Sequence, residues 1–160
     1  FFRSEIGVDI HNQNDDSFYG FNTSNGTGTN GYGESDWERD NTYNTNNYFN
    51  FKKIFGSRHA LDAVAGMSFQ EYQTEYANVY GEQFPVEDLK KLESAGLIKG
   101  GTSNATNASF VSYFARANYK FDDKYLLTVS GRVDGSSVFG TGNRYGFFPA
   151  ISAGWILSEE

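Results

Sequence analysis

The sequence of 160 residues contains no cysteine, only two prolines and one methionine. Without cysteine, disulfide frameworks and cysteine-based zinc or redox sites are excluded. No run of about 18 apolar residues is present, so no helix is expected to cross a bilayer. Cations are also few. Lys and Arg number 13 against 20 Asp and Glu, and the formal net charge of -7 argues against a nucleic-acid partner.

Phe1 opens directly on a strand-like pattern, so we expect no signal peptide in these residues. A length of 160 residues corresponds to one domain. We therefore expect a single-domain fragment of a longer protein, or a processed chain.

Aromatic residues are abundant, at 18% of the chain with 11 Tyr and 15 Phe, although the mean hydropathy is -0.57. A soluble core this aromatic would normally contain more Leu, Ile and Val. Two classes of protein fit this composition. One is a barrel with aromatic girdles and polar loops, and the other is a soluble β-protein with an aromatic binding face.

The clearest predicted element is the alternating segment 125–134, in which only Leu126 is out of step. Its length of about ten residues suits a long strand of a soluble sheet, and it also suits a transmembrane β-strand of about 9–11 residues. One face holds Tyr125, Leu127, Val129, Gly131 and Val133, and the other holds Thr128, Ser130, Arg132 and Asp134.

Similar alternation predicts further strands at 2–10, 41–55, 61–80, 111–121 and from Phe147 onward. Beyond Phe69 the apolar phase of the third segment slips to Tyr72 and Tyr76, which predicts a bulge or a water-exposed end.

The connections between these strands alternate in length. Segments rich in Asn, Gly, Ser and Thr predict long, extracellular-type loops at about 11–40, 80–110 and 135–146, and short, periplasmic-type turns are predicted at about 55–59 and 121–124. Inside the second loop, leucine spacing, an acidic first turn and a following glycine predict a short helix at Val86–Ala95. The fold class is therefore all-β. It is an antiparallel up-and-down meander of about six long strands with one loop helix, as in a slice of an outer-membrane barrel.

The last third of the sequence carries a family resemblance. Residues 112–140, SYFARANYKFDDKYLLTVSGRVDGSSVFG, continue with NRYGFFPAISAGW at 143–155 and SEE at 158–160. Together they resemble the β-barrel of SusC/RagA-type TonB-linked (TonB-dependent) outer-membrane transporters. The upstream segments FGSRHAL, GMSFQ and Phe84-Pro85 fit the same family more loosely. Val133 and Ile156 depart from the family pattern, in which polar or charged residues are common at these two positions.

This resemblance implies that residues 1–160 form part of a transmembrane barrel in the outer membrane of a Gram-negative bacterium. Complete barrels of this type have about 22 strands and a plug, and neither the plug nor a TonB box is present in this sequence. The implied function is import of glycans or other large nutrients. The implied partners are outer-membrane lipid, a SusD-like surface lipoprotein and TonB, with TonB contacted through an N-terminal region missing from this sequence.

Two sets of candidate residues follow from the alternation together with the resemblance. The candidates for the barrel lumen are Arg116, Arg132, Asp134 and Arg144. The candidates for lipid contact or an aromatic girdle are Tyr113, Tyr119, Phe121, Tyr125, Leu127, Val129, Val133, Ile151 and Trp155. The aromatic members of the second set are also compatible with a sugar-stacking platform, and polar lumen residues are also expected as simple structural filling.

No spacing typical of a metal or catalytic site is present. His11 and His59 lie at a loop start and in a turn, without a second ligand at a metal-binding distance in sequence. We therefore expect no metal, no cofactor, no catalytic residue and no enzymatic activity.

The alternative hypothesis is a soluble all-β carbohydrate-binding module that uses tyrosine and tryptophan as stacking surfaces. It predicts that Leu127, Val129, Ile151 and Ala153 are packed beneath another layer. The barrel hypothesis predicts that the same four residues are bare on an outer face.

Overall fold

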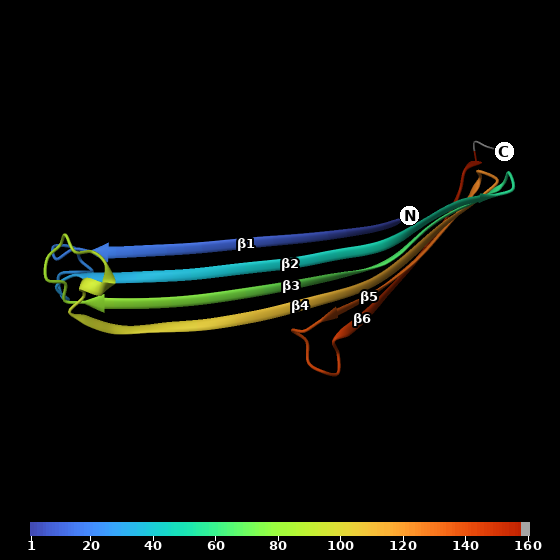
Figure 1. Cartoon of the computed structure of the whole chain (residues 1–160). Helices are drawn as coiled ribbons and strands as arrows, with labels where there is room; N and C mark the ends of the chain where they lie inside the picture. Colours follow the sequence, from blue (N-terminus) through green and yellow to red (C-terminus); the bar gives the residue numbers. More distant parts are fainter. Residues whose placement is uncertain (158–160) are drawn as a thin grey trace. The chain divides into compact units, whose positions relative to one another are not determined.

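The computed structural model describes residues 1–157, and six strands in one sheet account for most of them. The strands follow one another in the sheet in chain order, as an up-and-down meander (Figure 1). They are β1 (Phe2–Tyr19), β2 (Tyr32–Phe55), β3 (His59–Glu82), β4 (Leu97–Phe121), β5 (Tyr125–Ser136) and β6 (Tyr145–Trp155). The predicted all-β meander of about six strands is confirmed. The Ser-Glu-Glu end of the family resemblance, at 158–160, lies outside the described residues.

The first four strands are longer at their polar ends than predicted. The loops are 20–31, 83–96 and 137–144, in place of 11–40, 80–110 and 135–146. The prediction was wrong at these ends because it took Asn-, Thr- and Gly-rich sequence for loop. The backbone hydrogen bonds between strands need a partner strand and do not depend on apolar side chains. Polar residues can therefore continue a strand where both of its faces are in water. The short turns, at 56–58 and 122–124, lie within the predicted ranges.

The predicted helix at Val86–Ala95 is wrong. The structure has only a 3₁₀ turn, η1, at Leu92–Ser94, and its N-cap residue Lys91 makes no capping hydrogen bond with its side chain. Glu87, expected in the first helical turn, instead accepts a hydrogen bond at 2.7 Å from the backbone N–H of Phe21. A helix this short is marginal without packing, so contacts with the neighbouring loop decide the conformation. No helix in the described chain has the length and apolar character needed to span a membrane.

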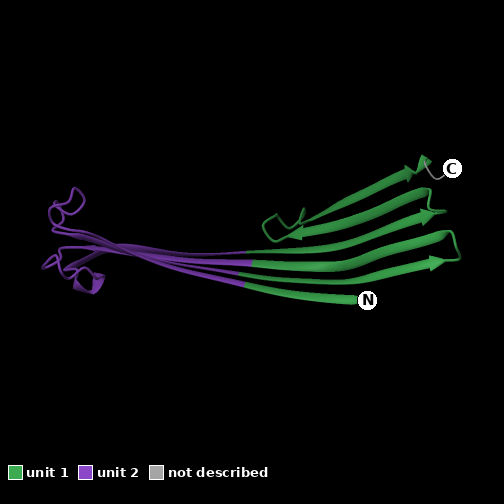
Figure 2. Ribbon diagram, turned by 90° about the horizontal axis from the view of Figure 1, so that it is seen from above, with its two compact units in different colours: residues 1–8, 42–71, 108–160 green, residues 9–41, 72–107 purple. Residues whose placement is uncertain are grey.

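The chain divides into two compact units (Figure 2). Unit 1 comprises residues 1–8, 42–71 and 108–160, so it holds all of β5 and β6 and both short turns. Unit 2 comprises residues 9–41 and 72–107, with the loops 20–31 and 83–96. The strands that lie wholly in unit 1, β5 and β6, have 12 and 11 residues. These lengths are close to the roughly 9–11 residues that a tilted strand needs to cross a bilayer.

The register of unit 1 places odd-numbered residues opposite odd-numbered ones and even-numbered residues opposite even-numbered ones. Val129 of β5 lies between Ala117 of β4 and Ile151 of β6, whereas Ser130 lies between Arg116 and Ala150. Successive side chains of a strand point to opposite faces. The period of two in the sequence therefore becomes two continuous faces that extend across three strands.

Unit 2 is organised around Phe84, which is fully buried. Its ring meets Phe18 edge-on at 5.0 Å between centroids. Asn30 joins the two loops, because its backbone O accepts from the Phe84 N–H at 2.9 Å and its amide donates to the Phe84 carbonyl at 3.1 Å. Within residues 1–157 no other apolar side chain is buried. The sheet therefore has no second layer against which to form a core.

Gly66 provides a test of strand pairing between β2 and β3. A Cβ at this position would lie 2.4 Å from the Asn47 carbonyl oxygen and 2.5 Å from Tyr48 Cβ. We expect Gly66→Ala in the full-length protein to lower its free energy of unfolding by about 1–3 kcal/mol, as overpacking does elsewhere. Urea unfolding followed by loss of the compact form on unheated gels measures the effect.

Gly142→Ala is the matched control, because nothing lies within 4 Å of a Cβ placed there. Equal unfolding midpoints for the two variants would contradict the close approach of β2 to Gly66.

Candidate functional site

The apolar face of unit 1 is built from the odd-numbered residues of β4, β5 and β6, according to the strand register. All nine residues predicted to meet lipid or form a girdle lie on this face: Tyr113, Tyr119, Phe121, Tyr125, Leu127, Val129, Val133, Ile151 and Trp155. Large side chains remain bare here, and Ile151 is 75% exposed. The Tyr145 ring covers Gly135, its partner in the register, and the Phe147 ring covers Gly131, which lies diagonally across from it.

The polar face of unit 1 carries three of the four residues predicted for the lumen. Arg132 donates from Nε to Asp134 at 2.6 Å and from Nη2 to the Ser112 hydroxyl at 2.9 Å. Arg116 lies further along the same face and donates to Asn118 at 3.2 Å. The chemistry of the face is that of paired charges and hydroxyls, which suits water and not hydrocarbon.

Arg144 does not join this cluster. It lies in the loop 137–144, and its Nε donates to the Phe139 carbonyl at 3.4 Å. Asp134 and Arg132 instead share a groove of about 340 Å³ with Ser68 and Gln70 of β3. The structure thus brings together two of the four predicted residues and adds β3 side chains to them.

Unit 2 carries an acidic ladder on β2, defined as Glu34, Asp36, Glu38 and Asp40, which alternate along the strand. Asn78, only 7% exposed, donates to Glu34 at 2.7 Å and to Asp36 at 2.9 Å. Sequence analysis missed this ladder because it assigned residues 11–40 to a loop. The period of two in the acidic residues was the available signal.

Tyrosines continue the same face of unit 2. Tyr32 lies between Tyr19 and Tyr80, with ring centroids 5.9 and 6.0 Å apart. Tyr76 donates its hydroxyl to Asp36 at 2.7 Å, and this hydrogen bond to the carboxylate raises the pKa of Tyr76. The slip of apolar phase therefore puts Tyr76 on the even-numbered face of β3, where its hydroxyl meets the acidic ladder.

The opposite face of unit 2 is polar as well. Arg39 donates to Asn12 at 3.0 Å, and Ser35 donates to Asp16 at 2.7 Å. Lys91 of the loop 83–96 forms an ion pair with Asp16. Both faces of unit 2 thus carry hydrogen-bonding groups, whereas unit 1 has one apolar face.

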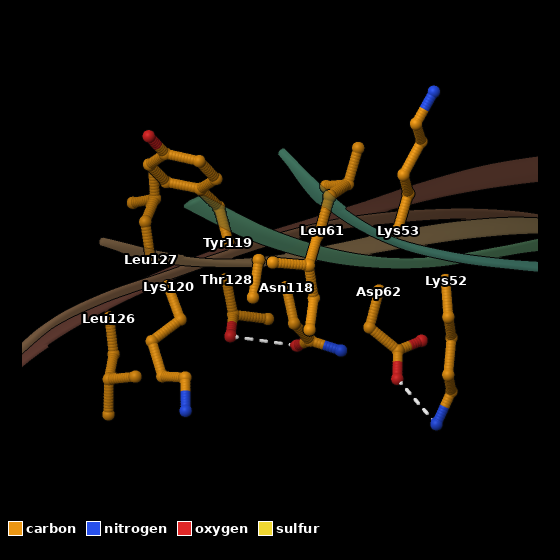
Figure 3. Close-up of a pocket in the computed structure, with 12 residues that line it drawn as sticks. Lys52, Lys53, Leu61, Asp62, Asn118, Tyr119, Lys120, Leu126, Leu127 and Thr128 are labelled. Atoms are coloured by element: carbon orange, nitrogen blue, oxygen red, sulfur yellow. Dashed lines mark hydrogen bonds and ion pairs between the residues drawn. The ribbon is translucent and has the colours of Figure 1, made fainter. Parts of the chain in front are cut away.

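A close-up of unit 1 shows that the sheet is a single layer there (Figure 3). Leu61, Tyr119 and Leu127 project to one side with Lys53, and Lys52, Asp62, Asn118 and Thr128 project to the other. These residues border a space of about 480 Å³. Because its lining comes from both sides of one layer, this space is not an enclosed ligand cavity.

An aromatic row crosses unit 1 beside the short turns and consists of His59, Phe121, Tyr125 and Trp155. Successive ring centroids are 4.9, 6.2 and 6.3 Å apart. Tyr125 pairs directly with Phe121 on one side and with Trp155 on the other. Tyrosine and tryptophan, which have an amphipathic ring, are enriched at membrane interfaces.

No group of three or more His, Asp or Glu side chains within residues 1–157 is arranged to hold a metal ion. Three carboxylates of the acidic ladder accept hydrogen bonds: Glu34 from Asn78, Asp36 from Asn78 and Tyr76, and Asp40 from Thr74.

Comparison with known proteins decides the family. The model of the TonB dependent receptor-like β-barrel family matches residues 3–160. The chain belongs to the TonB-dependent receptor β-barrel family. TonB-dependent receptor P39 of Formosa agariphila is 37% identical over 77% of this chain, and TonB-dependent receptor SusC of Bacteroides thetaiotaomicron is 33% identical over 83% of it. The matched parts cover 12% and 13% of those relatives, so the chain spans about an eighth of their length.

Solved structures of TonB-dependent receptor relatives show the same fold. The RagAB peptide transporter superposes on 95% of this chain with a TM-score of 0.88 at 25% identity, and 17% of that chain is covered. The TM-score with the RagAB peptide importer in its closed-closed state is 0.87. The strands of this chain therefore correspond to a slice of a TonB-dependent receptor barrel.

The family and the exposure of four apolar side chains together contradict the alternative hypothesis of a soluble carbohydrate-binding module. Leu127, Val129 and Ile151 are 40%, 47% and 75% exposed, and Ala153 is exposed as well. The soluble alternative required these residues to lie beneath a second layer. The TonB-dependent receptor family consists of outer-membrane receptors and transporters and not of enzymes.

The ion pair between Asp16 and Lys91 predicts a pH dependence in unit 2. The hydrogen bond from Lys91, and then that from Ser35, lowers the pKa of Asp16 below its ordinary value. The tie to the loop 83–96 is therefore present above about pH 4 and is lost as the pH falls through the lowered pKa. Hydrogen exchange of residues 83–96, corrected for intrinsic rates, is expected to rise as the pH falls through that range.

Lys91→Gln provides the control, because it removes the cation and leaves Asp16 in place. In this variant the acid-dependent rise should shrink, since only the Ser35 hydrogen bond still favours the ionised form. An unchanged pH profile would show that the ion pair does not hold the loop.

Proposed function

We propose that this chain forms part of the wall of an outer-membrane TonB-dependent importer of glycans or other large nutrients. In this proposal the apolar face of unit 1 meets lipid and the polar face lines the lumen. The long loops lie on the extracellular side, and the short turns lie on the periplasmic side. The wall has no catalytic role. The plug and the segment that contacts TonB lie elsewhere in the full-length protein.

The observation that carries the proposal is the concentration of exposed aliphatic and aromatic side chains on one face of unit 1, while the charged side chains Arg116, Arg132 and Asp134 lie on the other. An outward apolar band flanked by aromatic residues, with a polar interior, is characteristic of transmembrane β-barrels. A bare apolar surface is unfavourable in water, and in a family of outer-membrane barrels hydrocarbon is the environment that would cover it. In unit 2, where both faces are polar, a strand pair is instead suited to water.

The edges of the sheet support the same proposal. β1 and β6 lie at the two ends of the strand order. Unpaired backbone groups at an edge cannot be satisfied in lipid, so spanning sheets close into barrels. Strands elsewhere in the full-length protein would therefore pair with β1 and β6.

The loops 20–31 and 83–96 are the candidate contact for a SusD-like surface lipoprotein. They are held together by the buried Phe84 and by Asn30, as described above. This packing gives the partner a defined surface, which costs less entropy on binding than a disordered loop. The acidic ladder and the tyrosines of unit 2 are further hydrogen-bonding groups that a nutrient would meet.

Adjacent cysteines on β5 test the orientation of the two faces. Val129 lies on the apolar face and Ser130 on the polar face. In the full-length protein in vesicles, a fluorophore on Val129→Cys should be quenched several-fold more by nitroxide-labelled lipid than by iodide. A fluorophore on Ser130→Cys should show the reverse.

The two labels are one residue apart, so they share depth and differ only in face. Equal quenching by iodide at both positions would contradict a lipid-facing apolar surface. Recovery of the full-length protein in the soluble fraction without detergent would refute membrane location altogether.

Phe84→Ala tests the role of the loop cluster. Truncating a fully buried phenylalanine is expected to cost about 3–5 kcal/mol of local stability. Hydrogen exchange in residues 20–31 and 83–96 should rise, and co-purification with the lipoprotein should fall, while the barrel stays folded. The control is Val86→Ala, because this side chain in the same loop is 49% exposed. It should leave both the hydrogen exchange of the loops and the co-purification with the lipoprotein unchanged.

A further inference from the structure

Two cations lie at the apolar side of unit 1, beside the turn 56–58. Lys53 projects to the same side as Leu61 and Tyr119, opposite to its neighbour Lys52 (Figure 3). Arg58 lies in the turn itself, next to His59 of the aromatic row. A charge on the lipid side of a barrel is unfavourable at the bilayer midplane and is tolerated only close to the interface.

Both cations lie against aromatic rings. Lys53 Nζ is 4.9 Å from the ring centroid of Phe55, and the Arg58 guanidinium carbon is 5.9 Å from that of Phe121. Phe121 also belongs to the aromatic row, and its neighbour His59 hydrogen-bonds the Tyr119 hydroxyl at 2.5 Å. The rings therefore place the positive charges at the level of the aromatic row.

Neither cation has a carboxylate partner within residues 1–157. Lys52, on the other face, pairs with Asp62 at 2.8 Å. In the neighbouring turn Asp123 pairs with Lys120 at 2.6 Å, and Asp122 donates its backbone N–H to the Arg58 carbonyl at 2.7 Å. Among these lysines, the one on the apolar face differs from those on the polar face in having no anion beside it.

We propose that Lys53 and Arg58, together with the aromatic row, bind the phosphate of an anionic phospholipid headgroup. The charges are complementary, since Lys and Arg near a membrane surface attract anionic lipid. The apolar face below them is continuous, so the acyl chains of the same lipid lie along Leu61, Leu127 and the rings. A free phosphate ion would use the cations alone and gain nothing from that face.

This inference rests on the proposed membrane location of unit 1. A reporter in the turn tests it: a fluorophore on Ser57→Cys in the full-length protein, reconstituted in phosphatidylcholine vesicles. Brominated phosphatidylglycerol and brominated phosphatidylcholine are compared as quenchers of this fluorophore. Each basic residue near a membrane surface raises the affinity for anionic lipid by about fivefold. We expect phosphatidylglycerol to be preferred by roughly fivefold to thirtyfold, and the double variant K53Q/R58Q to lose this preference.

Lys52→Gln is the matched control, because it removes an equal charge from the same strand on the opposite face, and it should retain the preference. An equal preference in K53Q/R58Q and the unmutated protein would overturn the inference. The inference would also be overturned if excess inorganic phosphate, at constant ionic strength, abolished the preference for phosphatidylglycerol. That result would indicate a site for the free ion. Quenching of Val129→Cys by nitroxide lipid in the same preparations separates the two proposals, since its loss refutes the membrane location itself.

Discussion

Backbone pairing between neighbouring strands is the interaction on which the rest of this structure depends. Within residues 1–157 Phe84 is the one buried apolar side chain, so the sheet has no core to hold it. Each strand is instead held by the hydrogen-bond ladder with its neighbours, in the order β1 to β6. Close approaches such as that of Gly66 to the β2 backbone follow from this pairing. In lipid the same ladder is obligatory, because no water is available to satisfy a free N–H or C=O.

Once the ladder is fixed, the two-residue period of a strand divides the side chains of unit 1 between two environments. Val129 and Ser130 are neighbours in sequence and lie on opposite faces. The Arg132–Asp134–Ser112 cluster needs a polar environment, and Ile151 and Leu127 need an apolar one. A single layer of protein between lipid and an aqueous lumen satisfies both requirements. A TonB-dependent receptor barrel is such a layer.

The placement of charge follows the same division. Carboxylates of the acidic ladder are held by amide and hydroxyl donors from β3, and Lys52 is held by Asp62 on the polar face. Lys53 alone among the lysines that Figure 3 labels projects to the apolar side. Lys52 and Lys53 are neighbours in sequence, yet only Lys52 forms an ion pair within the described residues. The counter-charge of Lys53 must therefore come from outside them. The proposed phospholipid phosphate supplies that charge.

The sequence by itself determined the strand order, the two short turns and the residues of the apolar face, because the alternation in 111–155 is strong. Its resemblance to SusC/RagA-type transporters over 112–155 determined the family. It did not determine how far β1–β4 extend or the conformation of 86–95. Glu34 and Asp36 lie in a segment that alternates in acidic and not in apolar residues, and the hydrogen bonds from Asn78 across β2 and β3 show them to be a strand surface. Likewise, Glu87 was free to cap a helix or to bind the Phe21 N–H, and the neighbouring loop decided. Only the tertiary structure showed the extent of strands whose two faces are both in water, because neither face is then marked by alternating apolar residues.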